Sequence, residues 1–154
     1  MGGIGDDIST EIAERFLSTH GHGVLSLAKG NDGFGIPISY GYDASNDCCI
    51  VQFISDSESQ KRQFLETSET VTLTTYTYSQ SGDWQSVIAT GSLEALSDEE
   101  VADWAAEVFF SQAADVYASN RAVIQDSEIE WYALELETLT GRKSRDNNGV
   151  DSSH

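Results

Sequence analysis

The sequence predicts a mainly β fold of the α+β class, an antiparallel six-stranded β-barrel with flanking helices. Six stretches either alternate apolar with polar residues or are rich in β-branched and aromatic residues. Most neighbouring stretches are separated by short turn sequences, which suit hairpins. Helical patterns occur at the start of the chain, after the third strand and before the last one, so we expect helices on the outside of a barrel.

The first element is an amphipathic helix. Apolar residues recur at helical spacing over 8–17, and Ser9 or Thr10 is available as the N-cap. The pattern ends at Gly21, because glycine is the usual residue just past a helix end.

Six strands follow from the change to a period of two. We expect the strands 24–28 and 34–42 to form a hairpin that turns at residues 31–33, which read Asn-Asp-Gly. The remaining strands are predicted at 48–54, 70–78, 84–95 and 129–139.

Two further helices are predicted between the strands. Ser97 to Glu100 reads as a capping box that opens a helix over 101–109, and a second helical piece can continue through 113–117. A short helix is expected at 59–67. We therefore predict one domain, residues 8–140, with flexible tails at 1–7 and 146–154.

Charge is the strongest feature of the composition. The chain of 154 residues has 26 Asp and Glu against 8 Lys and Arg, a net charge of −18. Such a surface repels nucleic acid and anionic membranes, so we exclude both as partners. The acids accompany regular apolar patterns, which indicates a folded protein adapted to high salt, where screening reaches about 3 Å at 1 M. No signal peptide or membrane-spanning run is visible, so we expect a cytoplasmic protein.

The cysteines and histidines suggest no metal site. Cys48 and Cys49 are adjacent, so on a strand they point to opposite faces, and we interpret them as buried free thiols. We interpret His20 and His22 as loop histidines, because no further ligands follow them at metal-binding spacing. Nucleophile-elbow, P-loop and dinucleotide-binding patterns are also absent from the sequence.

One pair of cations is a candidate anion site. Lys61 and Arg62 follow a hydroxyl-rich stretch that includes Ser55 and Ser59, at the start of a predicted helix. Free N–H groups, hydroxyls and cations together suit a phosphate. The alternative is a solvated helix face, with Arg62 paired to the glutamates four residues away on either side. We interpret the second cluster, 142–145, as a solvated end of the chain.

The order of these elements resembles the pyridoxamine 5′-phosphate oxidase-like flavoproteins. The stretches that carry the resemblance span residues 10 to 96. They are Gly23-Val-Leu-Ser-Leu-Ala28, Gly35-Ile-Pro-Ile-Ser-Tyr-Gly-Tyr-Asp43, Ser59-Gln-Lys61, Trp84-Gln-Ser-Val87 and Gly91-Ser-Leu-Glu94.

The resemblance implies a split β-barrel that binds flavin mononucleotide (FMN) at the interface of a homodimer. By that similarity Ser59 and Lys61 would hold the phosphate, assisted by Arg62 and the Ser55 loop. The flavin ring would be lined, through backbone and side chain, by Ile38, Ser39 and Tyr40. Gln85 and Ser86 would approach it from a barrel strand, and Trp84 would shape the pocket.

Two departures leave the reaction open. Related nitroreductase-like members have a histidine where Ile54 follows Phe53 here, and the arginine-rich C-terminal pattern of true vitamin B6 oxidases is not matched by 140–144. The expected function is therefore a flavin-dependent oxidoreductase of unknown substrate, with the catalytic residues unassigned. The alternatives are a reductase that uses the deazaflavin F420, or a non-catalytic flavin-binding or structural dimer.

Overall fold

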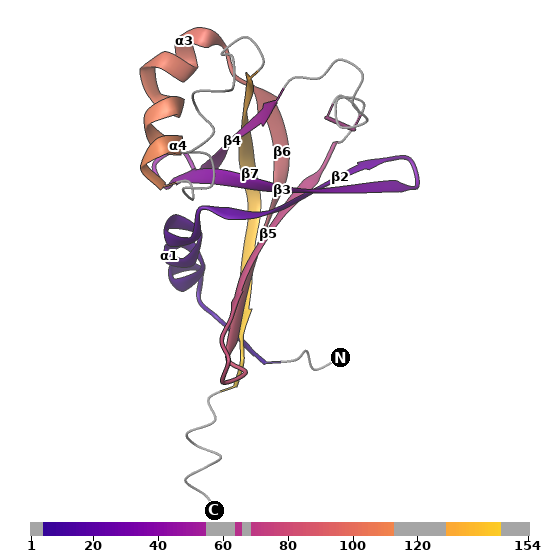
Figure 1. Ribbon diagram of the computed structural model, residues 1–154, viewed down its shortest axis with the longest axis vertical. Helices are drawn as coiled ribbons and strands as arrows, with labels where there is room; N and C mark the ends of the chain where they lie inside the picture. The colour runs from indigo at the N-terminus through magenta and orange to yellow at the C-terminus, as the bar shows by residue number, and fades with distance from the viewer. Residues whose placement is uncertain (1–4, 55–63, 66–68, 113–128, 146–154) are drawn as a thin grey trace, which may run out of the picture.

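The computed structural model describes residues 5–54, 64–65, 69–112 and 129–145, and these ranges form one β-barrel with helices on its outside (Figure 1). The predicted strands are all present, several of them longer than expected. The elements are β1 (Asp6–Asp7), α1 (Thr10–His20), β2 (His22–Lys29), β3 (Asp32–Asp43), β4 (Cys48–Ile54), β5 (Val71–Tyr78), β6 (Trp84–Ala95), α3 (Asp98–Glu100), the π-helical turn η1 (Val101–Ala105), α4 (Ala106–Gln112) and β7 (Ile129–Lys143).

The barrel is closed by its last strand. All pairings are antiparallel, in the order β7-β4-β3-β2-β5-β6, and β7 then pairs with β6 along most of its length. The predicted antiparallel six-stranded barrel is therefore confirmed. In Figure 1 the β2–β3 hairpin projects to one side, while the ends of β5, β6 and β7 extend together in another direction.

The core lies inside the barrel, and strand alternation decides which residues reach it. Tyr40, Leu25 and Leu73 are fully buried in this cluster, where they meet residues from every barrel strand and α1. The adjacent cysteines separate as expected, with Cys49 in the barrel core and Cys48 in a second cluster under α4. Both are buried free thiols, and burial raises the pKa of Cys48 to about 12, so neither behaves as a reactive thiolate.

The first helix begins and ends where its caps predict. The hydroxyl of Ser9 accepts a hydrogen bond from the N–H of Ile12 at 3.2 Å, and Gly21 closes the helix with φ of 73°. The hairpin turn was predicted one residue too late. Lys29 pairs with Asp32, so the turn residues are Gly30 and Asn31, with Gly30 at φ of 59° in the first central position, as a type II′ turn requires.

A helical segment covers the outer face of β4 and β7. The capping box is confirmed, since Ser97 and Glu100 exchange both side-chain to backbone hydrogen bonds. Phe109 is fully buried in the second cluster, and the Gln112 amide bonds both the N–H and the C=O of Tyr42. The amide therefore pairs with the backbone of Tyr42, which lies beyond the part of β3 that pairs with β2.

Asp6 and Asp7, which the sequence placed in a tail, form a short strand against the end of β7. Asp6 pairs with Lys143, and the guanidinium of Arg142 donates to the carboxylate of Asp7 at 2.7 Å. Arg142, expected at a solvated end, thus ties the N-terminal strand to the barrel.

Two predicted helical segments lie partly or wholly outside the described residues. Of 59–67 only Phe64 and Leu65 are described, and Phe64 is buried with its ring stacked on Phe34 at 5.2 Å. The predicted helical piece at 113–117 and the tail at 146–154 lie outside the described residues. None of the described helices is long and apolar enough to cross a membrane.

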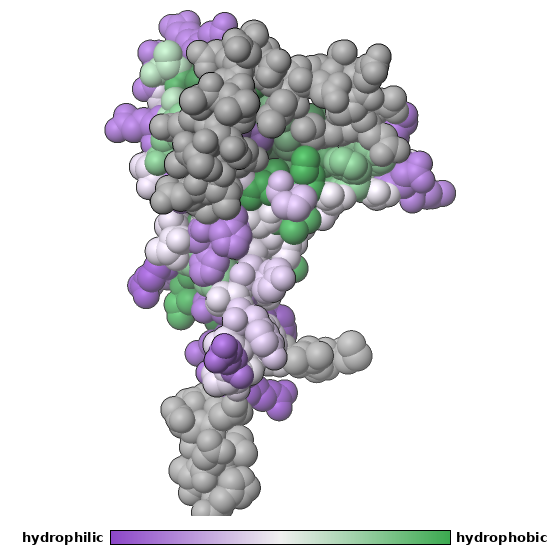
Figure 2. All heavy atoms as spheres, viewed as in Figure 1, coloured by the Kyte–Doolittle hydropathy of each residue, from purple (hydrophilic) through white to green (hydrophobic). Residues whose placement is uncertain are grey.

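Figure 2 shows how hydrophilic and hydrophobic residues are distributed on one face of the molecule. Hydrophilic residues occupy much of its edge, while hydrophobic ones gather near the centre, where β2, β3 and β5 cross in Figure 1. The sheet therefore presents an apolar area to solvent in a strongly acidic protein.

Candidate functional site

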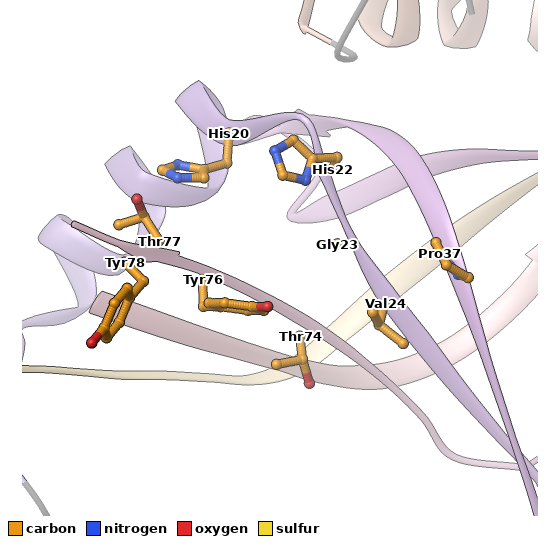
Figure 3. Close-up of a pocket in the computed structure, with 9 residues that line it drawn as sticks. All are labelled: His20, His22, Gly23, Val24, Pro37, Thr74, Tyr76, Thr77 and Tyr78. Atoms are coloured by element: carbon orange, nitrogen blue, oxygen red, sulfur yellow. The ribbon is translucent and has the colours of Figure 1, made fainter. Parts of the chain in front are cut away.

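A cleft opens where β2 and β5 separate. Their pairing is recorded from Ser26 with Thr72 to Val24 with Thr74, after which β5 continues to Tyr78 while the chain at β2 turns back into α1. The cleft has a volume of about 480 Å³, within the usual range for small-molecule sites. Its walls are His20, His22, Gly23, Val24, Pro37, Thr74, Tyr76, Thr77 and Tyr78 (Figure 3).

Two histidines form one wall of the cleft. His20 is the last residue of α1 and His22 the first of β2, so they terminate regular elements rather than lying in a loop. The ring of His20 stacks on Phe16 at 3.8 Å and lies 6.1 Å from the ring of His22. Among the described residues, the buried Nδ1 atom of His20 has no well-formed hydrogen bond. Burial lowers the pKa of His20, a weak interaction with the backbone of Phe16 opposes this shift, and the neighbouring His22 adds to it.

The end of β5 forms the opposite wall, which Figure 3 shows across from the two imidazoles. Tyr76 is 63% exposed and Tyr78 is 70% exposed, so both rings are open to solvent. The hydroxyl of Thr75 donates to the carbonyl of His22 at 2.8 Å and connects the two walls. A Cβ at Gly23 would lie 2.5 Å from the carbonyl oxygen of Thr74, so glycine is needed where the strands begin to diverge.

The described residues that line this cleft include no Asp or Glu, although the chain has 26 of them. A second cleft beside α3 shows the contrast, since Glu94, Glu100 and Glu135 line it. There burial raises the pKa of Glu135, and the charges of Glu94 and Asp47 add to the effect. The cleft of histidines and tyrosines therefore suits a planar ligand that is neutral or negatively charged. We call it the His–Tyr cleft.

A family model described as pyridoxamine 5′-phosphate oxidase matches residues 9–143. The chain belongs to this family. No curated protein matches the sequence.

Solved structures share the fold. An FAD-binding protein from Mesorhizobium loti has a TM-score of 0.69 at 17% identity, over 90% of this chain and 96% of that one. The FAD-binding protein from Mycobacterium smegmatis has a TM-score of 0.60 at 17% identity, over 92% of this chain and 99% of that one. The predicted split barrel is thereby confirmed, since these proteins match almost end to end.

The three residues of β3 that were predicted to bind the cofactor do not all point to the same face of the sheet. The side chains of Ile38 and Tyr40 point into the barrel core, where they are 5% and 0% exposed, so only their backbone can face a ligand. Ser39 points to the other face and is 1% exposed, yet its hydroxyl has no hydrogen-bond partner among the residues that the structure describes. Ser39 pairs with His22 across the hairpin, which places it next to the His–Tyr cleft.

The predicted residues of β6 lie one strand beyond the tyrosine wall. Trp84 pairs with Tyr78, and Ser86 pairs with Tyr76, so Gln85 falls between these positions. A Cβ at Gly5 would lie 2.8 Å from the Trp84 ring, so this indole packs against the N-terminal segment. Within one chain these residues neighbour the cleft without lining it.

The remaining predicted site residues, Ser55, Ser59, Lys61 and Arg62, lie outside the described residues. Among the residues that the structure does describe, no group of three or more metal-ligating side chains is present. Sequence reasoning did not assign the histidines and tyrosines of the cleft to a site. The signal that could have found the tyrosines is their spacing of two in an otherwise threonine-rich strand, which puts two rings on one face.

Proposed function

We propose that this protein binds FMN in the His–Tyr cleft and that it is a flavin-dependent oxidoreductase. The observation that carries the proposal is a cleft whose described lining has two tyrosine rings and no Asp or Glu, in a chain of net charge −18. Aromatic walls suit a planar ring, and acidic groups would repel the negative phosphate of the cofactor.

The orphaned hydroxyl of Ser39 supports a polar planar ligand. A buried hydroxyl without a partner costs folding free energy, and such groups in native proteins call for an explanation. The edge of a flavin ring carries carbonyl and N–H groups along its length, which can satisfy a serine. Backbone groups of Ile38 and Tyr40 would face the same ring edge.

The choice of FMN rests on the supply of cations. Lys61 and Arg62, with Ser55 and Ser59, would hold one phosphate, and between Lys29 and Arg121 this pair contains the chain's only cations. FAD, after which two of the structural relatives are named, carries a second phosphate, and F420 carries an acidic tail. Both would require more positive charge than one such pair supplies.

A second copy of the chain would complete the site. Trp84, Gln85 and Ser86 lie outside the cleft of their own chain, so in a homodimer they would reach the ring bound by the partner. The sheet offers a surface for this contact, because Val24 and Ile88 are 37% and 42% exposed on the same face as Tyr76. Bound flavin supplies the electron transfer, while these residues bind and orient it.

The test is direct. Purified protein should be yellow, or take up FMN with quenching of flavin fluorescence, and the released chromophore should have the mass of FMN. A colourless protein that takes up no flavin sinks the proposal. If FMN binds, stopped-flow mixing with NADH or NADPH separates an oxidoreductase from a non-catalytic flavin carrier, because only the former is reduced rapidly.

Ser39→Ala should have opposite effects on binding and on stability. We expect FMN affinity to fall about 5- to 10-fold, since a hydrogen bond contributes about 1 kcal/mol. The free protein should be as stable as wild type or up to about 1 kcal/mol more stable, because an unsatisfied hydroxyl is removed. FMN titration and urea unfolding measure the two effects. Ser26→Ala, on the exposed face of β2, is the control. A loss of stability with unchanged affinity would assign the hydroxyl to folding instead.

The large negative net charge should make the stability of the fold depend on salt. We propose that the protein is adapted to a salty cytoplasm, and we expect the melting temperature to rise steadily from 0.1 M to molar KCl. The reason is that like charges on the surface repel across about 10 Å at 0.1 M and only about 3 Å at 1 M. Calorimetry across this range checks it, and a flat or falling curve would contradict salt adaptation.

A further inference from the structure

The groups that can carry a positive charge lie on one wall of the His–Tyr cleft. The titratable groups that face it are His20 from α1, His22 from β2, and Tyr76 and Tyr78 from β5, while β3 contributes only Pro37. Of these only the imidazoles can carry a positive charge. One wall of the cleft can therefore become cationic, and none of the described lining residues is an acid that would cancel that charge.

The histidine wall is held in place from both sides. The ring of His20 stacks on Phe16 with only 13° between the planes, and its position in the last turn of α1 puts it near carbonyl groups that favour a cation. The backbone of His22 is held by the hydroxyl of Thr75. Stacking therefore restrains the ring of His20, and the backbone of His22 is fixed so that its exposed ring lies on the same wall of the cleft.

Burial makes this charge conditional. Because burial lowers the pKa of His20, the ring is neutral near pH 7 in the free protein. A negative group entering the cleft favours the protonated ring and draws a proton onto it. The histidine wall therefore distinguishes ligands by charge. An anion interacts with a protonated imidazole, whereas a neutral ring of the same shape makes only ordinary hydrogen bonds to it.

The charge of a flavin ring differs between its oxidised and reduced states. The oxidised ring is neutral; uptake of a hydride, which is two electrons and one proton, leaves it with one negative charge. A nicotinamide-type donor supplies the hydride and becomes oxidised in turn. Protein charge next to the ring is one of the means by which flavoproteins adjust this equilibrium.

We propose that His20 and His22 make the cleft bind reduced, anionic FMN more tightly than oxidised FMN, and so raise the reduction potential of the bound cofactor. This inference rests on the proposed function of the cleft. The two histidines are positioning and charge-setting residues in the wall of the ring pocket, and neither of them holds the phosphate.

The experiment compares both redox states of FMN on wild type, His22→Gln and the double variant His20→Gln/His22→Gln. Fluorescence titration gives the affinity for oxidised FMN, and dye-equilibrium potentiometry of the bound flavin gives the affinity ratio. At pH 6.5 we expect wild type to favour the reduced form at least 10-fold, a shift of about 30 mV for a two-electron couple. The ratio of the affinity for reduced FMN to that for oxidised FMN should fall toward one in the double variant. In His22→Gln it should fall at least 3-fold.

Arg15→Gln is the matched control, because it removes a full positive charge from an exposed position on α1 that does not line the cleft. It should leave the ratio unchanged. The wild-type preference should also shrink between pH 6.5 and 9, as the imidazole of His20 loses its proton. Circular dichroism verifies folding, and if the double variant unfolds, His22→Gln decides, since its ring is exposed.

The outcomes separate the two proposals. If wild type binds FMN and the histidine variants keep the full preference, the histidines are structural and the inference is overturned while the proposed function stands. If wild type binds no FMN in either redox state, the proposed function falls and the inference falls with it.

Discussion

Gly91→Ala is expected to destabilise the barrel by about 4 kcal/mol or more, a large part of the roughly 5 to 15 kcal/mol that holds such domains together. Gly91 lies in β6 where β7 crosses it to close the barrel. A Cβ at this position would overlap the carbonyl oxygen of Glu135 and lie 2.7 Å from its carbon. The neighbour is backbone in a paired strand, so it cannot rotate away as a side chain would.

Urea unfolding measures the effect, with Gly33→Ala as the matched control. Gly33 is also a strand glycine, in β3, but a Cβ there meets no atom within 4 Å and its φ is not positive. We expect Gly33→Ala to equal wild type or exceed it by about 0.5 to 1 kcal/mol, since alanine loses less backbone entropy on folding. Equal stability of Gly91→Ala and wild type would mean that the strands do not cross this closely.

The barrel could be predicted because its pattern of alternation is strong, but the register of its closing strand could not. Gly91 pairs with Leu136 while Thr90 pairs with Thr138, so one residue of β7 bulges out at this point. The bulge reverses the alternation, which is why Leu136 and Leu139 both pack toward the core despite their odd spacing. A strand predicted at 129–139 on strict alternation misses this change and the four residues that follow.

The candidate site was predicted less completely than the fold, and the reason is geometric. Ser39 could be chosen from the family resemblance, but that its hydroxyl is buried and unpaired depends on what packs over it. His20 and His22 carry no pattern that marks a site, and they face Tyr76 only because β2 and β5 diverge after Val24. Such a divergence is a property of three-dimensional strand paths, so local spacing does not reveal it.

Lys61→Ala is expected to weaken FMN binding about 10- to 100-fold while leaving the fold intact. A charge-assisted hydrogen bond to phosphate contributes about 1.5 to 3 kcal/mol, and each 1.4 kcal/mol is a factor of ten in affinity. The loss should be large in this chain because only three residues are lysine, and Arg62 has glutamates four residues away on either side to pair with. Fluorescence titration with FMN measures the affinity, and a melting curve verifies the fold.

The control for this variant is Lys29→Ala, which makes the same change of charge at the end of the β2–β3 hairpin. Both variants take the net charge from −18 to −19, so a general electrostatic effect on an anionic ligand would weaken binding equally in the two. A specific phosphate contact weakens it only in Lys61→Ala. Riboflavin, which lacks the phosphate, sharpens the comparison, since its affinity should not change in either variant. Equal losses in both variants, or a parallel loss for riboflavin, would remove Lys61 from the phosphate site and leave the ring-binding role of the His–Tyr cleft to be judged on its own titrations.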